Sequence, residues 1–443
     1  MKRERILPEA PTGTAATIGY RYSLTLLTTI YLFNFVDRQV VNIVAEPIKT
    51  EFGLADWQLG AMTGLSFAVL YTLCGFPFAR WAERGDRSRI ISIAVVSWSI
   101  MTTLCGIAQN FTQFLLARIG VGLGEAGCTP PAHSLISDIV PVARRASALA
   151  LYSMGAPMGQ LLGMAMGGFV AAQWGWRAVF FVAGIPGLAL ALLALFTLPE
   201  PRRAAVRDLA SAGVEPEGFW RILRLFLTNR SFMLVCAGGA AASFVFYGLS
   251  SFYASFFLRN HTLQLNDAAQ NMGLQPIGFL GLALGLSGGV AGIGGAIIGG
   301  RVADAWARRN DAAHVLLPAL CTSLAAPLLF AAMFVPGIWA SIVLIAAASA
   351  LNSSWTGAAY AAALGLAPAR SRATASALMM FVFNIVGLGL GPLCVGLLSD
   401  AFAPSLGAGG GLRLGMACGT LAGLGAAACF WAARKRLHVD AMA

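Results

Sequence analysis

Long apolar runs dominate the sequence, and each is long enough to cross a bilayer as a helix. Twelve runs of about 20 residues follow one another, separated by charged residues or by Gly and Pro. Because lipid offers the backbone no hydrogen bonds, such runs fold as helices. We place them at roughly 23–45, 57–80, 90–108, 111–136, 146–173, 177–198, 231–258, 276–303, 314–335, 338–366, 373–400 and 411–433. The sequence therefore predicts an all-α polytopic membrane protein with twelve transmembrane helices.

The composition supports this prediction against a soluble fold. Of the 443 residues, 58% are hydrophobic and only 11% are charged, whereas soluble proteins carry about 25% charged residues. A chain of this length would otherwise suggest two or three soluble domains. The scarcity of charge excludes that organisation.

The net charge of +11 raises the question of a nucleic-acid partner, but the positions of the basic residues argue against one. Of the 30 Lys and Arg residues, 24 fall in alternate loops and in the two terminal segments. Loops rich in Lys and Arg stay on the cytoplasmic side of a membrane. We therefore expect an inner-membrane protein with both termini in the cytoplasm and no nucleic-acid partner. The first 22 residues lack the apolar core of a signal peptide and are expected to form a cytoplasmic tail.

A polar segment divides the runs into six and six. Its prolines and mixed charges predict a cytoplasmic linker. The expected organisation is a tail at 1–22, a six-helix bundle at 23–198, the linker at 199–230, a second bundle at 231–433 and a tail at 434–443.

The two halves repeat each other weakly. "ARWAERGDRSR" follows the second run and "GGRVADAWARR" follows the eighth, so that Glu83 matches Asp304 and Arg87 matches Arg308 at one spacing. The fifth run opens with "RASALALYSMGAPMG" and the eleventh with "RATASALMMFVFNIVGLGLGP". Such a repeat predicts two bundles related by a pseudo-twofold axis along the membrane normal. A binding site between two such bundles is the architecture of a transporter.

These motifs resemble the major facilitator superfamily, and the resemblance covers nearly the whole chain. More narrowly, "NFVDRQVVNIVAEPIKTEFGLADWQLG", "RIGVGLGEAGCTPPAHSLISDIVP" and "QWGWRAVFFVAGIPG" resemble the spinster family. The resemblance implies the major facilitator fold and alternating access. It also implies transport of sphingosine-1-phosphate or lysophospholipids coupled to protons. Glu83 stands where the superfamily usually has Asp, which keeps the charge.

Four charged residues lie well inside predicted membrane helices rather than at or near their ends. Asp37 and Arg38 are adjacent in the first run, where each charge costs roughly 2.5–3.5 kcal/mol at the bilayer centre. Arg118 and Glu125 share one face of the fourth run, about 10 Å apart along its axis. Asp37 and Arg118 should lie at similar depth, with Glu125 two turns further in.

Charges at these positions are tolerated around a shared polar cavity. Either they form a static salt bridge that locks two helices, or Asp37 or Glu125 takes up and releases a proton. The spinster resemblance points to the same four residues. In the second case both carboxylates compete for Arg118, which holds an anionic head group when it is released. Arg38, which points about 100° away from Asp37, would neutralise a second site or the head group.

Two further sets of residues are candidates for gating and substrate binding. Charges at the ends of the second, third and eighth helices either close the cytoplasmic side or only signal topology: Glu83, Arg84, Arg87, Asp304 and Arg308. No charges like those of the first half occur in the seventh or tenth runs, so coupling should reside in the first half. The substrate-binding candidates are Arg118 and, in the second half, Tyr247, Asn352, Tyr360, Phe381 and Asn384, with Ser250, Ser354 and Trp355 at similar depth.

The sequence thus predicts a proton-coupled secondary transporter of an amphipathic or lipid-like anion. The alternatives are proton-coupled transport of small organic anions, or multidrug efflux. An enzyme would need a nucleophile–base pair or a metal cluster, and we find neither, so no cofactor or metal is expected. The GxGxxG of Gly122, Gly124 and Gly127 lies in mid-helix, where close helix packing explains it better than nucleotide binding. The expected partners are the substrate, protons and membrane lipids, with the protein itself a monomer.

Overall fold

The computed structural model describes residues 14–141, 144–201, 224, 226–310, 312–367 and 371–435. Within these residues the chain is helical, and each of the twelve expected runs coincides with helix. The first helix begins at Thr14, earlier than the expected run at 23. The rest of the predicted N-terminal tail, most of the linker and most of the C-terminal tail lie outside the described residues.

The first bundle contains the helices up to residue 197. They are α1 (Thr14–Ile43), α2 (Ala45–Phe52), α3 (Asp56–Gly60), the π-helix η1 (Ala61–Leu65), α4 (Ser66–Arg84), α5 (Arg87–Ile107), α6 (Phe111–Glu125), α7 (Thr129–Ile139), α8 (Arg145–Ser153) and α9 (Gly155–Thr197). Side-chain caps fix where two of these helices begin. Asp86 accepts a hydrogen bond from the backbone of Arg89 at the start of α5, and Asn110 accepts one from Gln113 at the start of α6.

The second bundle contains the helices from residue 230 onward. They are α12 (Arg230–Ser250), α13 (Tyr253–Asn260), α14 (Thr262–Asn271), α15 (Pro276–Gly285), η3 (Leu286–Val290), α16 (Ala291–Ala307), α17 (Ala313–Phe334), α18 (Ile338–Ser354), α19 (Thr356–Leu366), α20 (Arg372–Val382), η5 (Phe383–Leu390) and α21 (Gly391–Arg434). Asn229 caps α12 by accepting from the backbone of Phe232.

By length and composition, eight helical stretches among the described residues could span a membrane. The two longest, of 51 and 61 residues, each turn at a glycine in the left-handed region, Gly175 (φ 78°) and Gly407 (φ 72°). Glycine adopts this conformation without the steric cost that other residues meet. Each of these stretches therefore holds two expected runs. Two expected runs are not among these eight stretches. The first run lies on α1, and the fourth run lies on α6 and α7 together.

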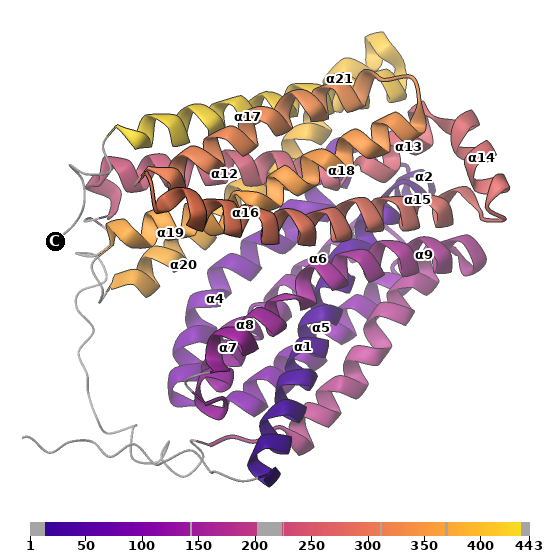
Figure 1. Cartoon of the computed structure of the whole chain (residues 1–443). Coiled ribbons are helices and arrows are strands. Elements are labelled where there is room, and N and C mark those ends of the chain that lie inside the picture. The colour runs from indigo at the N-terminus through magenta and orange to yellow at the C-terminus, as the bar shows by residue number, and fades with distance from the viewer. Residues whose placement is uncertain are drawn as a thin grey trace, which may run out of the picture.

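The two bundles meet at one end of the molecule and diverge toward the other (Figure 1). We call the end formed by α2, α13 and α14 the distal end. The start of α1 and the C-terminal end of α21 lie away from it. The most extensive contacts between the bundles are those of α9 with α15 and of α3 with α21.

Glycines bring the backbones of the two bundles into contact at both junctions. A Cβ atom at Gly60 would lie 2.2 Å from the carbonyl oxygen of Pro392, and one at Gly281 would lie 2.3 Å from that of Met164. Neither position accepts a side chain without separating the bundles.

The glycines of α6 confirm the predicted helix packing. A Cβ atom at Gly122 would lie 2.4 Å from the carbonyl oxygen of Phe67 in α4, and one at Gly124 would lie 2.6 Å from the amide nitrogen of Trp98 in α5. This close approach presses the face of α6 that carries Arg118 and Glu125 against its neighbours.

Candidate functional site

The four charged residues predicted from the sequence gather inside the first bundle. Asp37 and Glu125 are 0% exposed and Arg118 is 1% exposed. The side chain of Arg38 is 13% exposed and is the most accessible of the four. Two carboxylates and two guanidinium groups balance each other in charge.

These residues form two ion pairs between α1 and α6. Arg38 Nε lies 2.6 Å from Glu125 Oε2, and Arg118 Nη1 lies 3.5 Å from Asp37 Oδ2. The sequence led us to expect Glu125 to compete with Asp37 for Arg118, but its ion pair is with Arg38. The reason is that long helical side chains point back toward the helix N-terminus, so Arg38 reaches the depth of Glu125.

The guanidinium of Arg38 is surrounded by aromatic rings. Its Cζ lies 4.9 Å from the ring centre of Phe35, 4.7 Å from that of Phe67 and 4.4 Å from that of Tyr71. Such cation–π contacts stabilise a cation away from water. They explain how an arginine is held at the edge of an apolar bundle.

The two ion pairs leave several buried atoms without partners. Among the described residues, Asp37 Oδ1, Glu125 Oε1 and Arg118 Nε have no hydrogen-bond partner. A buried polar atom without a partner costs about 1–3 kcal/mol, and more when the group is charged. A static bridge is stable only when its remaining hydrogen-bonding capacity is satisfied. These three atoms therefore need a partner that the two ion pairs do not supply.

In the second bundle, two of the predicted substrate-binding residues lie toward this cluster. Tyr247 of α12 interacts electrostatically with Arg38 and Tyr71. Tyr360 of α19 in turn interacts with Tyr247. Tyr71, Tyr247 and Tyr360 thus lie near one another between Arg38 and the second bundle, and we call them the tyrosine row.

The remaining candidates of the second bundle are placed differently. Asn352 accepts a hydrogen bond at 2.9 Å from the indole nitrogen of Trp355, which lies three positions further along the chain. Phe381 and Asn384 are half-buried, and Phe383 is the aromatic residue that packs on Tyr360, with ring centres 5.9 Å apart. Sequence reasoning missed Phe383 because η5 is a π-helix, which shifts the side chains away from a regular α-helical register.

The gating candidates whose side chains the structure describes, Arg87, Asp304 and Arg308, do not form an ion pair between the two bundles in this conformation. Arg87 is buried and binds Glu200 Oε1 at 2.5 Å and Asp138 Oδ2 at 2.7 Å, both within or directly after the first bundle. Asp304 and Arg308 are exposed near the end of α16. The side chains of Glu83 and Arg84 lie outside the part of the chain that the structure describes. Closure of the cytoplasmic side by these residues stays a prediction.

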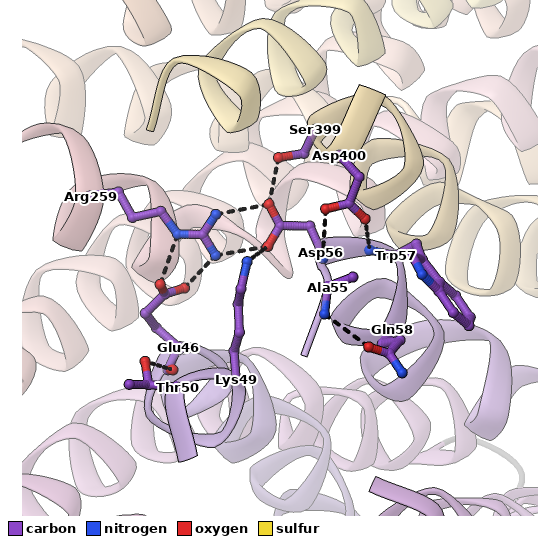
Figure 2. A network of polar contacts seen from close by, with 10 residues as sticks. All are labelled: Glu46, Lys49, Thr50, Ala55, Asp56, Trp57, Gln58, Arg259, Ser399 and Asp400. Atoms are coloured by element: carbon purple, nitrogen blue, oxygen red, sulfur yellow. Dashed lines mark hydrogen bonds and ion pairs between the residues drawn. The ribbon is translucent and has the colours of Figure 1, made fainter. Parts of the chain in front are cut away.

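An ion-pair network at the distal end joins the bundles instead (Figure 2). Arg259 of α13 binds the carboxylate of Glu46 in α2 through contacts of 2.8 and 2.6 Å. It also binds the carboxylate of Asp56 in α3 through contacts of 2.8 and 2.9 Å. Lys49 of α2 pairs with Asp56 as well. One arginine of the second bundle thus holds two carboxylates of the first.

The same network ties α21 to the start of α3. Asp400 accepts hydrogen bonds from the backbone N–H groups of Asp56 and Trp57 at 2.9 and 2.8 Å, and Ser399 donates to Asp56 Oδ2 at 2.5 Å (Figure 2). Ala55, the residue before α3, has no side chain that could cap the helix. Asp400 therefore caps a helix of the opposite bundle. We call Glu46, Lys49, Asp56, Arg259, Ser399 and Asp400 the distal network.

Comparison with known proteins agrees with this architecture. The sequence matches the Major Facilitator Superfamily over residues 27–392. An MFS-type efflux pump of Mycolicibacterium smegmatis is 32% identical over 422 residues, which cover 94% of this chain and 92% of that protein.

Two crystal structures of a bacterial homologue of the human lysosomal transporter spinster are also similar. The inward-facing, occupied form has a TM-score of 0.82 at 30% identity and covers 96% of this chain and 99% of that one. The inward-facing, unoccupied form has a TM-score of 0.83 at 30% identity, with coverages of 98% and 100%. The chain belongs to the Major Facilitator Superfamily, a family of twelve-helix membrane transporters rather than enzymes, and within it resembles the spinster proteins.

Proposed function

We propose that this transporter couples the movement of an amphipathic or lipid-like anion to protons. The observation that carries the proposal is the pair of carboxyl groups, Asp37 and Glu125, held between two arginines inside an apolar bundle. These carboxyl groups lie next to each other. Adjacent carboxylates repel each other when both are ionised. Uptake of one proton removes this electrostatic repulsion.

Proton uptake also changes which cation is free. When one carboxylate is neutralised, its arginine loses a partner and becomes available to an anionic head group, which guanidinium binds in a bidentate manner. Release of the proton restores the ion pair and displaces the anion. Arg118 is the arginine that pairs with Asp37, while Arg38 is the more exposed and lies beside the tyrosine row. In this proposal the head group first contacts Arg38. It then binds deeper in the bundle, at Arg118.

The second bundle supplies surroundings for the apolar part of such a substrate. Three aromatic side chains lie between Arg38 and the interior of the second bundle: Tyr247, Tyr360 and Phe383. The further candidates for substrate binding are Asn352, Phe381 and Asn384. A charged head with an apolar remainder fits a charged first bundle beside an aromatic second bundle. Similarity to a spinster homologue supports this substrate class. Similarity to an efflux pump supports multidrug efflux as the second candidate.

The distal network defines the conformational state in this proposal. The excess of Lys and Arg in the termini-side loops orients the termini toward the cytoplasm. The distal network then closes the extracellular side, and the protein is inward-facing, as are the spinster homologue structures that it resembles. In the outward-facing state, Glu83, Arg84, Arg87, Asp304 and Arg308 would close the cytoplasmic side.

Flux in proteoliposomes tests the proposal. Vesicles containing the protein would be offered a lysophospholipid, a sphingoid phosphate, a small organic anion and a cationic drug, each with and without a pH gradient. We expect the gradient to drive one of the two lipid-like anions and to have no effect in vesicles containing Asp37→Asn. Gradient-driven flux of the small anion or the drug alone would replace the proposed substrate class. Flux that ignores the gradient for every substrate would contradict proton coupling.

A further inference from the structure

Three polar side chains that the proposed transport cycle does not use are buried beside the carboxyl pair. Asn34 of α1 is 1% exposed, and Trp98 and Thr102 of α5 are 0% exposed. Both amide atoms of Asn34, the indole nitrogen of Trp98 and the hydroxyl of Thr102 lack a hydrogen-bond partner among the described residues. Side chains of these types are normally satisfied when buried.

The helices place these three side chains around Asp37 and Glu125. Asn34 precedes Asp37 and Arg38 by one turn, so it shares their face of α1. The hydroxyl of Thr102 lies beside the Asp37 carboxyl without a well-formed hydrogen bond. Trp98 lies one turn before Thr102 and packs against Gly124 of α6. Its indole lies beside the thiol of Cys128, three residues after Glu125. Helices α1, α5 and α6 thus surround one polar region.

The unpartnered atoms of this region include both donors and acceptors. The acceptors are Asp37 Oδ1, Glu125 Oε1 and Asn34 Oδ1, and the donors include the indole N–H of Trp98 and the amide of Asn34. Left unpaired, each would cost about 1–3 kcal/mol. A buried region with several donors and acceptors is where proteins bind internal water, whereas an apolar cavity stays dry. Water bound in this region would satisfy all of these groups at once.

We propose that water held by Asn34, Trp98 and Thr102 connects Asp37 to Glu125 and carries the proton between them. The inference rests on the proposed proton coupling. A protonated carboxyl gives its proton to the water, and the water gives one of its own protons to the other carboxylate, so no atom is gained or lost. Asn34, Trp98 and Thr102 act as positioning residues that hold the water. The other titratable or charged groups facing the two carboxyls are Arg38, Arg118, Tyr31, Cys105 and Cys128.

Two nearly isosteric substitutions remove the water-binding groups without opening a cavity, Asn34→Leu and Thr102→Val. We expect each to lower pH-driven uptake at least about tenfold, because a positioned proton transfer accelerates a step by about 10²–10⁴. Counterflow, in which labelled substrate exchanges without net proton movement, should stay close to wild type. Asn34→Ser, which keeps a hydroxyl and leaves room for water, should recover part of the pH-driven rate.

Ser99→Ala is the matched control. Ser99 is buried on the same helix, and its hydroxyl also lacks a partner among the described residues. It faces α9 instead, because a Cβ atom at Gly187 would lie 2.1 Å from its oxygen. This variant should transport like wild type.

Infrared difference spectra between low and high pH provide a second readout. Bands of bound water shift when H₂¹⁸O replaces H₂¹⁶O, and we expect such bands in wild type and in Ser99→Ala but not in Asn34→Leu. Normal pH-driven uptake by Asn34→Leu and Thr102→Val, with Asp37→Asn inactive, would overturn the water connection and leave proton coupling standing. Wild-type flux that ignores the pH gradient would instead defeat the proposed function itself.

Discussion

The two bundles share one fold but differ in what they bury. Among the described residues, every buried Asp, Glu or Arg lies in the first bundle or in the short segment that directly follows α9. The buried polar residues from 230 onward are Ser, Thr and His, and the central contacts there are aromatic, as between Trp355 and Phe383. A repeated architecture therefore does not mean a repeated chemistry. The first bundle carries the fully buried charges, and the second carries an apolar and aromatic wall.

The largest effect is expected from removing the deepest cation. Arg118→Ala leaves Asp37 buried without its partner, which destabilises a protein by about 3–5 kcal/mol in comparable cases. Substrate binding, measured by isothermal titration, should be lost. Adding Asp37→Asn removes the unpaired charge and should restore thermal stability without restoring binding. If the double variant binds substrate as wild type does, Arg118 has no role in holding the head group.

The next effect concerns the distal network. Arg259→Ala breaks charge-assisted contacts to Glu46 and Asp56, each worth about 1.5–3 kcal/mol, and should shift the population toward distal opening about tenfold or more. A cysteine introduced at Thr63 of a cysteine-free background, at present buried in η1, should become accessible to a membrane-impermeant thiol reagent.

Arg413→Ala is the control for this experiment. Arg413 lies on α21 toward the distal end and forms no ion pair among the described residues. Equal labelling of the two variants would show that the network does not hold the distal end closed.

A smaller effect is expected in the second bundle. Tyr360→Phe removes only a hydroxyl from the tyrosine row and should raise the half-saturating substrate concentration about fivefold, the equivalent of one ordinary hydrogen bond. Its pH dependence of transport should match wild type, because no proton-carrying group is altered. A displaced pH profile would mean that the second bundle takes part in coupling, and the comparison between the bundles would fail.

The smallest effect concerns a structural contact between α2 and α9 at the distal end. Glu51 accepts hydrogen bonds from the indole of Trp176 at 2.6 Å and from Arg177 at 2.7 Å, and these bonds lower the pKa of its carboxyl. A lowered pKa stabilises the fold above the unfolded-state pKa, and the stabilisation is lost as the pH falls through the folded-state pKa. Because Glu51 is half-exposed, the contribution should stay below about 1 kcal/mol. Thermal unfolding of Glu51→Gln should differ from wild type at neutral pH and converge with it in acid.

Much of this structure follows from the sequence, because membrane helices are specified locally. Apolar runs fix the helices, and glycines spaced along α6 indicate close packing that the structure confirms. The four charges stand out because charge is rare inside a membrane segment. Their pairing does not follow from spacing alone, since the length and direction of the Arg38 side chain decide that it reaches Glu125.

Other features depend on contacts between distant segments. Arg259 and Asp56 are 203 positions apart, and Asp400 and Asp56 are 344 apart. Nothing near Asp56 in the sequence indicates that a residue of the opposite bundle caps its helix. Phe383 was missed for another reason, because a π-helix cannot be read from α-helical periodicity.

The central claim is that Asp37 and Glu125 couple protons to transport, and pH-gradient-driven uptake into proteoliposomes tests it most directly. We predict that Asp37→Asn and Glu125→Gln each reduce gradient-driven uptake to the level of empty vesicles. Both variants should remain folded and inserted in the membrane. Counterflow should be retained where the freed arginine, Arg118 in Asp37→Asn or Arg38 in Glu125→Gln, still binds the head group. Gradient-driven uptake at the wild-type rate by Asp37→Asn would make its pair with Arg118 a structural bridge and would contradict the account.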